Sequence, residues 1–137
     1  ERLASILLEK TSNKNIVITL GEQGILAYSR LSGIKNSHYR SEFFPALATS
    51  PKDVAGAGDA MLTGFALGLS SDLNIYESSV IASCMAALSV MRVGNTSLTV
   101  HEVQEYIQKL IKFREFYGQT NLIQSPPLKE SEHNFVN

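Results

Sequence analysis

Two glycines close together, directly ahead of a helical pattern, constrain this chain more than any other feature. The run is Asp53-Val-Ala-Gly-Ala-Gly-Asp59, and it continues as Ala60-Met-Leu-Thr-Gly-Phe-Ala-Leu-Gly68. Glycines let the backbone turn tightly and let a ligand approach its N–H groups. Because the next residues predict a helix, those groups are expected at its N-terminus, where unpaired donors and the helix dipole favour phosphate. The run therefore predicts an anion-binding turn.

The aspartate in this turn suits a base better than an anion ligand. Asp59 would repel a phosphate, but it could accept a proton from a hydroxyl group. The N–H groups of Gly56, Ala57 and Gly58 would meanwhile hold the charge of a transferring phosphoryl group. The alternative is that the glycines only form a turn, with Asp59 favoured by the helix dipole. A loop that attracts anions and carries a carboxylate indicates a phosphotransferase.

The whole run resembles the second signature of the ribokinase-like (PfkB) carbohydrate kinase family, usually written D-T-x-G-A-G-D. Both aspartates, both glycines and the central alanine match, and Val54 stands where threonine is common. The resemblance implies an ATP-dependent kinase that phosphorylates a hydroxyl of a sugar or related compound. Asp59 would be its general base, and the backbone of residues 56–59 its anion hole. ATP and a Mg²⁺ ion bridging the ATP phosphates are the implied cofactors.

Two further segments resemble the nucleotide site of this family. Thr19-Leu-Gly-Glu-Gln-Gly24 is similar to its T-x-G-x-x-G segment, which lies along the nucleotide. Thr19 offers a hydroxyl, and Gly21 and Gly24 permit close approach of a ligand. A hairpin turn explains this segment equally well. Residues 92–96, Arg-Val-Gly-Asn-Thr, resemble the far side of the site, which makes Gly94 a nucleotide-binding candidate. The arginine is alternatively a cation at a helix C-terminus.

Asp53 has two readings that the sequence leaves equally open. In the resemblance it helps to hold the loop and, in members that need one, contacts a monovalent cation such as K⁺. The matching backbone carbonyls in this chain are those of Ala55, Ser89 and Gly94. The alternative is that Asp53 accepts hydrogen bonds from N–H groups of the loop.

Alternating strand and helix patterns predict an α/β fold with a largely parallel sheet. Residues 16–20 suit a buried parallel strand, residues 25–28 a second strand, and residues 39–44 a strand that Pro45 ends or places at an edge. The N-terminal residues predict a surface helix. Its expected apolar stripe is Leu3, Ile6 and Leu7.

Three more helices are expected. In the one after the glycine turn, small residues at 60, 64 and 68 would lie close against a sheet. A capping box of Asn74 and Glu77 begins a helix that is expected to run to about residue 93. This helix is apolar around its whole circumference and is therefore expected in the interior, with Cys84 as a buried hydrophobic residue. Thr99 and Glu102 open the last one. Its expected buried stripe is Val103, Ile107, Leu110 and Ile111.

The resemblance makes the fold class α/β, a Rossmann-like layered sheet with flanking helices, the C-terminal part of a ribokinase-like fold. It covers residues 1–117, and residues 118–137 are expected to be a loose tail. The chain begins inside a helical pattern, and nothing in it resembles the sugar-contacting half of the family. It is thus expected to be a piece of a longer protein. The alternative to a kinase is an incomplete nucleotide- or phosphate-binding fragment without turnover.

Charge and hydropathy narrow the partners. Twelve basic and thirteen acidic residues give a net charge of −1, so no general electrostatic drive toward nucleic acid or acidic membranes is expected. No stretch has the length of a transmembrane span or the form of a signal peptide, which makes the cytoplasm the default compartment. Expected partners are a nucleotide and a small sugar-like substrate. The motifs are as similar to those of bacterial kinases that act on heptose phosphates as to those of ribokinase. The chain is also expected to form homo-oligomers.

Overall fold

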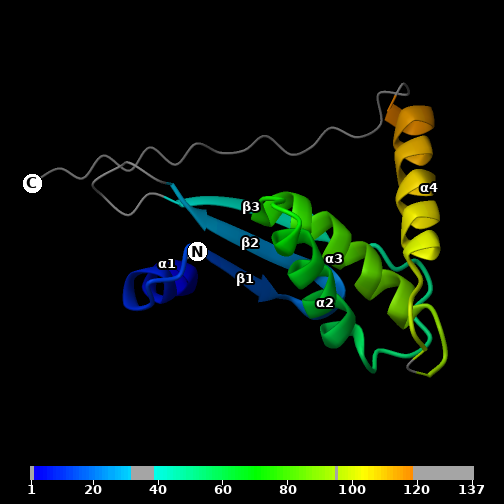
Figure 1. Ribbon diagram of the computed structural model, residues 1–137, viewed down its shortest axis with the longest axis horizontal. Coiled ribbons are helices and arrows are strands. Elements are labelled where there is room, and N and C mark those ends of the chain that lie inside the picture. The colour runs from blue at the N-terminus through cyan, green and yellow to red at the C-terminus, as the bar shows by residue number, and fades with distance from the viewer. Residues whose placement is uncertain (1, 32–38, 95, 119–137) are drawn as a thin grey trace, which may run out of the picture.

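The computed structural model describes residues 2–31, 39–94 and 96–118. Figure 1 shows a small sheet with helices around it. The elements in order are α1 (Arg2–Lys10), β1 (Asn15–Thr19), the 3₁₀ turn η1 (Gly21–Gln23), β2 (Gly24–Arg30), β3 (Tyr39–Pro45), α2 (Ala57–Ser70), α3 (Ile75–Val90) and α4 (Val100–Gly118). Of the tail expected at residues 118–137, Gly118 instead ends α4, and the rest lies outside the described residues, as does Asn95 of the predicted nucleotide segment.

The sheet is antiparallel throughout its described part. Its strand order is β1-β2-β3, with Ile16 opposite Tyr28 and Leu26 opposite Phe43. The parallel sheet and the fully buried first strand predicted from the sequence are therefore wrong. Only a short turn joins β1 to β2, whereas a parallel pair needs a crossover of about a dozen residues or more. The prediction of an edge strand is confirmed, because β3 lies at the edge and Pro45 is its last residue.

Helix α1 packs on the sheet through a stripe that the sequence did not single out. Ala4 and Leu8 are buried and form a core cluster with Tyr28 of β2. The expected stripe is wrong, because Ile6 and Leu7 are exposed. Residues four apart share a helix face, and in a run of three consecutive apolar residues at 6–8 the periodicity fits either stripe.

Helix α3 is the central helix of the domain. It lies between α2 and the sheet, as Figure 1 shows, and it also contacts α4. Most of its residues are buried, Cys84 among them, and the expectation of an interior helix is confirmed. Burial raises the pKa of the Cys84 thiol to about 11, so the thiol stays protonated at neutral pH.

The small residues of α2 face α3, not the sheet. A Cβ built on Gly64 would lie 2.6 Å from the Cα of Ala82, and one on Gly68 would lie 2.6 Å from the Oγ of Ser78. The two helix backbones therefore approach closely along this line. The sequence correctly predicted close packing of this face but named the wrong partner, because a ridge of small residues suits a helix as well as a sheet.

Both predicted capping boxes are present. The Asn74 side chain accepts hydrogen bonds from the amides of Tyr76 and Glu77, and Glu77 reaches back to the Asn74 amide. Thr99 and Glu102 do the same for α4. The apolar stripe of α4 is only partly buried, and Ile111 is 52% exposed, contrary to expectation. No helix in the described ranges is long and apolar enough to cross a bilayer.

We expect this 137-residue chain to self-associate in solution. Helix α2 is apolar on both faces, and the face opposite its glycines is uncovered, with Leu62 68% and Leu69 44% exposed. The outer edge of β1 pairs with no other described strand. Exposed apolar patches and free strand edges favour association. Size-exclusion chromatography with light scattering should show species above 15.0 kDa that increase with concentration, and a stable monomer at high concentration would contradict this expectation.

Candidate active site

The glycine turn starts α2 earlier than the sequence predicted. Gly56 is the N-cap residue, with φ 79° and ψ −3°, and the helix begins at Ala57. A left-handed backbone of this kind is costly for residues with a Cβ, which explains the first glycine of the motif. The amide of Ala60 donates to the Gly56 carbonyl at 2.9 Å. Gly58 and Asp59 consequently belong to the first helical turn.

The first turn of α2 presents free donors beside a free carboxylate. The amide of Ala57 donates to the Val54 carbonyl at 3.4 Å. The amides of Gly58 and Asp59, and the carboxylate of Asp59, have no hydrogen-bond partner within the described part of the chain, and both residues are exposed. No side chain caps this end of the helix. The turn can therefore offer amide donors to an anion and a carboxylate to a proton donor at the same place.

Asp53 ties together two loops that flank this turn. Its Oδ1 accepts the amide of Ala55 at 3.0 Å, and its Oδ2 accepts the amide of Gly94 at 3.3 Å. The amides of Asp53 and Lys52 in turn donate to the carbonyl of Val90, at 3.1 and 2.7 Å, at the C-terminal end of α3. The hydrogen-bonding alternative for Asp53 is thus realised in the structure. These hydrogen bonds connect the C-terminal end of α3 to the segment that enters α2.

The residues suggested for a monovalent cation belong to the segments that meet at Asp53. Asp53 contacts Ala55 and Gly94, while Ser89 precedes the Val90 carbonyl that holds Asp53. All the donors are oxygens, as a hard cation requires. The Ser89 carbonyl already accepts the amide of Arg92 at 3.3 Å, and the Gly94 carbonyl accepts that of Thr96 at 3.0 Å. The amide of Met91 also points at the Ser89 carbonyl, whereas Gly94 keeps one of the two lone pairs of its carbonyl oxygen to offer.

The predicted nucleotide segment at residues 19–24 forms the turn between β1 and β2. Thr19 is the exposed last residue of β1, Gly21 begins η1 and Gly24 begins β2. Packing alone requires glycine at position 24, since a Cβ there would lie 2.1 Å from the carbonyl oxygen of Phe44. Thr19 and Gly21 are open to solvent. In Figure 1 this turn and the glycine turn both lie toward the end of the molecule away from α1.

The loop between α3 and α4 contains an ion pair that the sequence did not predict. The guanidinium of Arg92, just after α3, pairs with the carboxylate of Glu102 in the first turn of α4, and it also donates to the Ser97 carbonyl at 3.3 Å. The amide and hydroxyl of Thr99, followed by Arg92, hold the pKa of Glu102 below its ordinary value. The capping motif identified Glu102 as a helix-start residue, but no sequence signal pairs it with a residue ten positions earlier.

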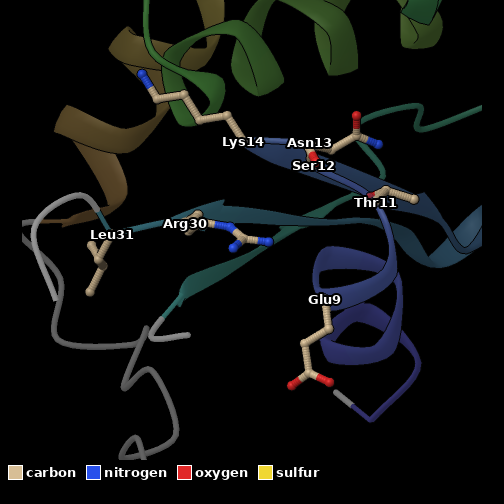
Figure 2. A pocket seen from close by; sticks show the side chains of 7 residues that line it. All are labelled: Glu9, Thr11, Ser12, Asn13, Lys14, Arg30 and Leu31. Atoms are coloured by element: carbon tan, nitrogen blue, oxygen red, sulfur yellow. The ribbon is translucent and has the colours of Figure 1, made fainter. Parts of the chain in front are cut away.

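A pocket of about 280 Å³ lies at the opposite end of the sheet from the β1–β2 turn. It is lined by Glu9, Thr11, Ser12, Asn13, Lys14, Arg30 and Leu31. Figure 2 shows Arg30 directed from β2 toward the end of α1, where its guanidinium donates to the Leu8 carbonyl. The Lys14 side chain points away from α1. None of the motif residues lines this pocket. We therefore place the candidate site at the open N-terminus of α2.

Comparison of the fold identifies the class of protein first. The structure is similar to a ribokinase from Thermotoga maritima, with a TM-score of 0.67 and 29% sequence identity over 79% of this chain and 34% of that chain. It is also similar to Escherichia coli phosphofructokinase-2, solved in complex with potassium, with a TM-score of 0.66. At 18% identity, this second likeness shows the fold alone. The chain thus has the fold of part of a ribokinase-like kinase.

The sequence comparison then gives the family. The profile of the pfkB family carbohydrate kinases matches residues 1–102, and the chain belongs to this family. Among curated relatives, it is 35% identical to the bifunctional protein HldE of Aliarcobacter butzleri over 106 residues, which are 77% of this chain and 20% of that protein. It is 30% identical to HldE of Sulfurimonas denitrificans over 80% of this chain and 21% of that protein. The chain therefore spans about a fifth of these relatives.

Proposed function

We propose that this chain carries the phosphoryl-transfer end of a kinase active site, which transfers the γ-phosphoryl group of ATP to a hydroxyl of a sugar or related compound. The observation that supports this most is the first turn of α2. There, the unpartnered amides of Gly58 and Asp59 lie in the same turn as the free Asp59 carboxylate. Membership of the pfkB family carbohydrate kinases adds independent support.

In the proposed reaction, the Asp59 carboxylate takes the proton of the acceptor hydroxyl. The hydroxyl oxygen then forms a bond to the γ-phosphorus, the bond from that phosphorus to the bridging oxygen breaks, and ADP leaves with the bonding electron pair. The amides of Gly56, Ala57, Gly58 and Asp59 would hold the negative charge on the phosphoryl oxygens, and the Ala57 amide would exchange its 3.4 Å bond to the Val54 carbonyl for this contact. Helix dipole and amide donors act together there, because α2 begins at this point.

The remaining predicted residues would serve the nucleotide and the ions. Thr19, Gly21, Gly24 and Gly94 are proposed to line the nucleotide. No group of three His, Cys, Asp or Glu side chains that could hold a metal occurs among the described residues. A Mg²⁺ ion would therefore be held chiefly by the ATP phosphates, where it neutralises charge. Asp53 and the carbonyls of Ala55, Ser89 and Gly94 are the proposed donors for a K⁺ ion.

A second candidate function is nucleotide or phosphate binding without turnover. The observation that favours it is that the chain matches only 34% of the length of the ribokinase with a similar fold. Phosphoryl transfer requires both substrates to be held in reacting geometry, and the site at the start of α2 accounts only for the phosphate side. The two candidates share the same site and differ in whether an acceptor is held.

One experiment tests the shared site and asks whether the chain turns over by itself. The 137-residue chain is titrated with MgATP by calorimetry and, in parallel, incubated with MgATP and a panel of sugars and sugar phosphates. We expect weak nucleotide binding and no phosphorylated product, since the acceptor is not positioned. Robust turnover would show that the chain holds both substrates by itself. Failure to bind either MgATP or inorganic phosphate would contradict the proposed anion site.

A further inference from the structure

We propose that Glu102 of α4 is a positioning residue for the phosphate-binding turn, which it reaches through Arg92 and Asp53. The proposal rests on the proposed kinase function and adds a residue of α4 to that site. The family match reaches only the first turn of α4, ending at Glu102, and most of the helix lies beyond it. The contacts of this helix supply one.

The first step links α4 to the loop that follows α3. Arg92 pairs with Glu102 and also donates to the carbonyl of Ser97, so one side chain closes the loop between the two helices. The two side chains are 27% and 37% exposed. An ion pair that is partly shielded from solvent is less screened by salt than a fully exposed one. The loop that contains Gly94 is thereby held against the start of α4.

The second step links that loop to the glycine turn. The Gly94 amide donates to Oδ2 of Asp53, while Oδ1 of the same carboxylate accepts the amide of Ala55, next to the N-cap residue Gly56. A displacement of Gly94 would therefore remove one of the two bonds that orient the Asp53 carboxylate. The position of the Ala55 amide, and with it the entry into α2, depends on the loop that Arg92 and Glu102 close.

A second contact of α4 supports the same role. The Tyr106 hydroxyl donates to the Leu47 carbonyl at 2.8 Å, in the segment that leads from β3 to the glycine turn. Tyr106 lies four residues after Glu102 and hence on the same helix face. The two chain segments that meet at Asp53 are thus both held by one face of α4. A helix that only covered α3 would not need these two contacts with the loops.

The test compares Glu102→Gln with the matched control Glu105→Gln in the 137-residue chain. Glutamine at position 102 can still accept the Thr99 amide and keep the capping box, but it loses the charge that pairs with Arg92. Glu105 lies one turn away and is exposed, and its ion-pair partner within the described part of the chain is His101, at 3.6 Å. Water exchange of the Ala55 and Gly94 amides is measured by NMR, with thermal unfolding as a check on overall stability.

We expect Glu102→Gln to speed exchange of both amides about 2- to 5-fold, the range that loss of a partly shielded ion pair supports. Glu105→Gln should leave both rates unchanged. The double variant with Arg92→Gln should be no faster than the stronger single variant, because the two residues act through one contact. Unchanged exchange in Glu102→Gln, or a uniform increase across the whole chain, would overturn the proposal.

A MgATP titration of the same variants separates this proposal from the proposed function. If Glu102 positions the turn, the dissociation constant of Glu102→Gln should rise about 2- to 5-fold relative to that of the control. If the unaltered chain binds no MgATP, the proposed nucleotide site fails, and the amide exchange still decides whether Glu102 positions the turn.

Discussion

Replacing Asp59 with asparagine is expected to remove most of the kinase activity of a full-length protein that contains this chain. The substitution keeps the size of the side chain but removes the group that would accept the hydroxyl proton. Loss of a positioned base costs about 10²- to 10⁴-fold in rate. The amides of the first turn of α2 belong to the backbone and remain in place. Nucleotide affinity should therefore be kept, and loss of a negative charge beside the phosphates should not weaken it.

The measurement is steady-state turnover of Asp59→Asn in the full-length protein, with MgATP affinity measured separately in the 137-residue chain. Asp72→Asn is the matched control, because it removes the same charge just after the opposite end of α2. The control should retain normal turnover. Near-normal turnover of Asp59→Asn would show that Asp59 only stabilises the helix N-terminus, an effect of about 0.3–1 kcal/mol.

Gly24→Ala is expected to destabilise the chain more than the same change at Gly21 or Gly58. A Cβ at position 24 would lie 2.1 Å from the Phe44 carbonyl oxygen and 2.8 Å from the Ala46 amide nitrogen, both in the backbone. Its φ of 117° is also rare for residues with a side chain. Overpacking and left-handed strain together suggest a loss of about 2–5 kcal/mol, a large share of the stability of a small domain.

Urea unfolding followed by circular dichroism would measure this loss, with the other two glycines as controls. Gly21 has a φ of 60° but open space around it, so Gly21→Ala should show the strain alone, about 1–2 kcal/mol. Gly58 has open space and a helical conformation, so Gly58→Ala should be neutral or stabilising by up to about 1 kcal/mol. Equal losses for Gly24→Ala and Gly21→Ala would mean that β3 moves aside without cost.

Local sequence signals predicted the helix starts well, and long-range pairing less well. The capping boxes at Asn74 and Thr99 depend on residues three positions apart, and both are present. The direction of β1 depends on which strand it joins, and the apolar content of residues 16–20 does not contain this information. The same holds for Gly64 and Gly68, whose spacing predicts a close neighbour without identifying it.

The candidate site shows the same division. The motif from Asp53 to Asp59 could be identified because its residues are consecutive, and the alternatives for Asp53 could be stated in advance. The contacts that hold the motif could not, since they join residues far apart in sequence. Asp53 meets Gly94 and Tyr106 meets Leu47 only because α3 and α4 bring them together. The roles of the individual site residues stay predictions that the Asp59 and Glu102 variants test.

The contact between α2 and α3 also limits how the site can move. A Cβ on Gly64 would lie 2.6 Å from the Cα of Ala82 and one on Gly68 would lie 2.6 Å from the Oγ of Ser78, so at these two points the helices pack closely against small residues. The pair should behave as one rigid body. Rearrangement on ligand binding would then be absorbed by hinges in the segments on either side of it, where Gly56 and Gly94 have positive φ angles of 79° and 78°. The anion-binding turn is thus fixed at its helical side and adjustable only at its loop side.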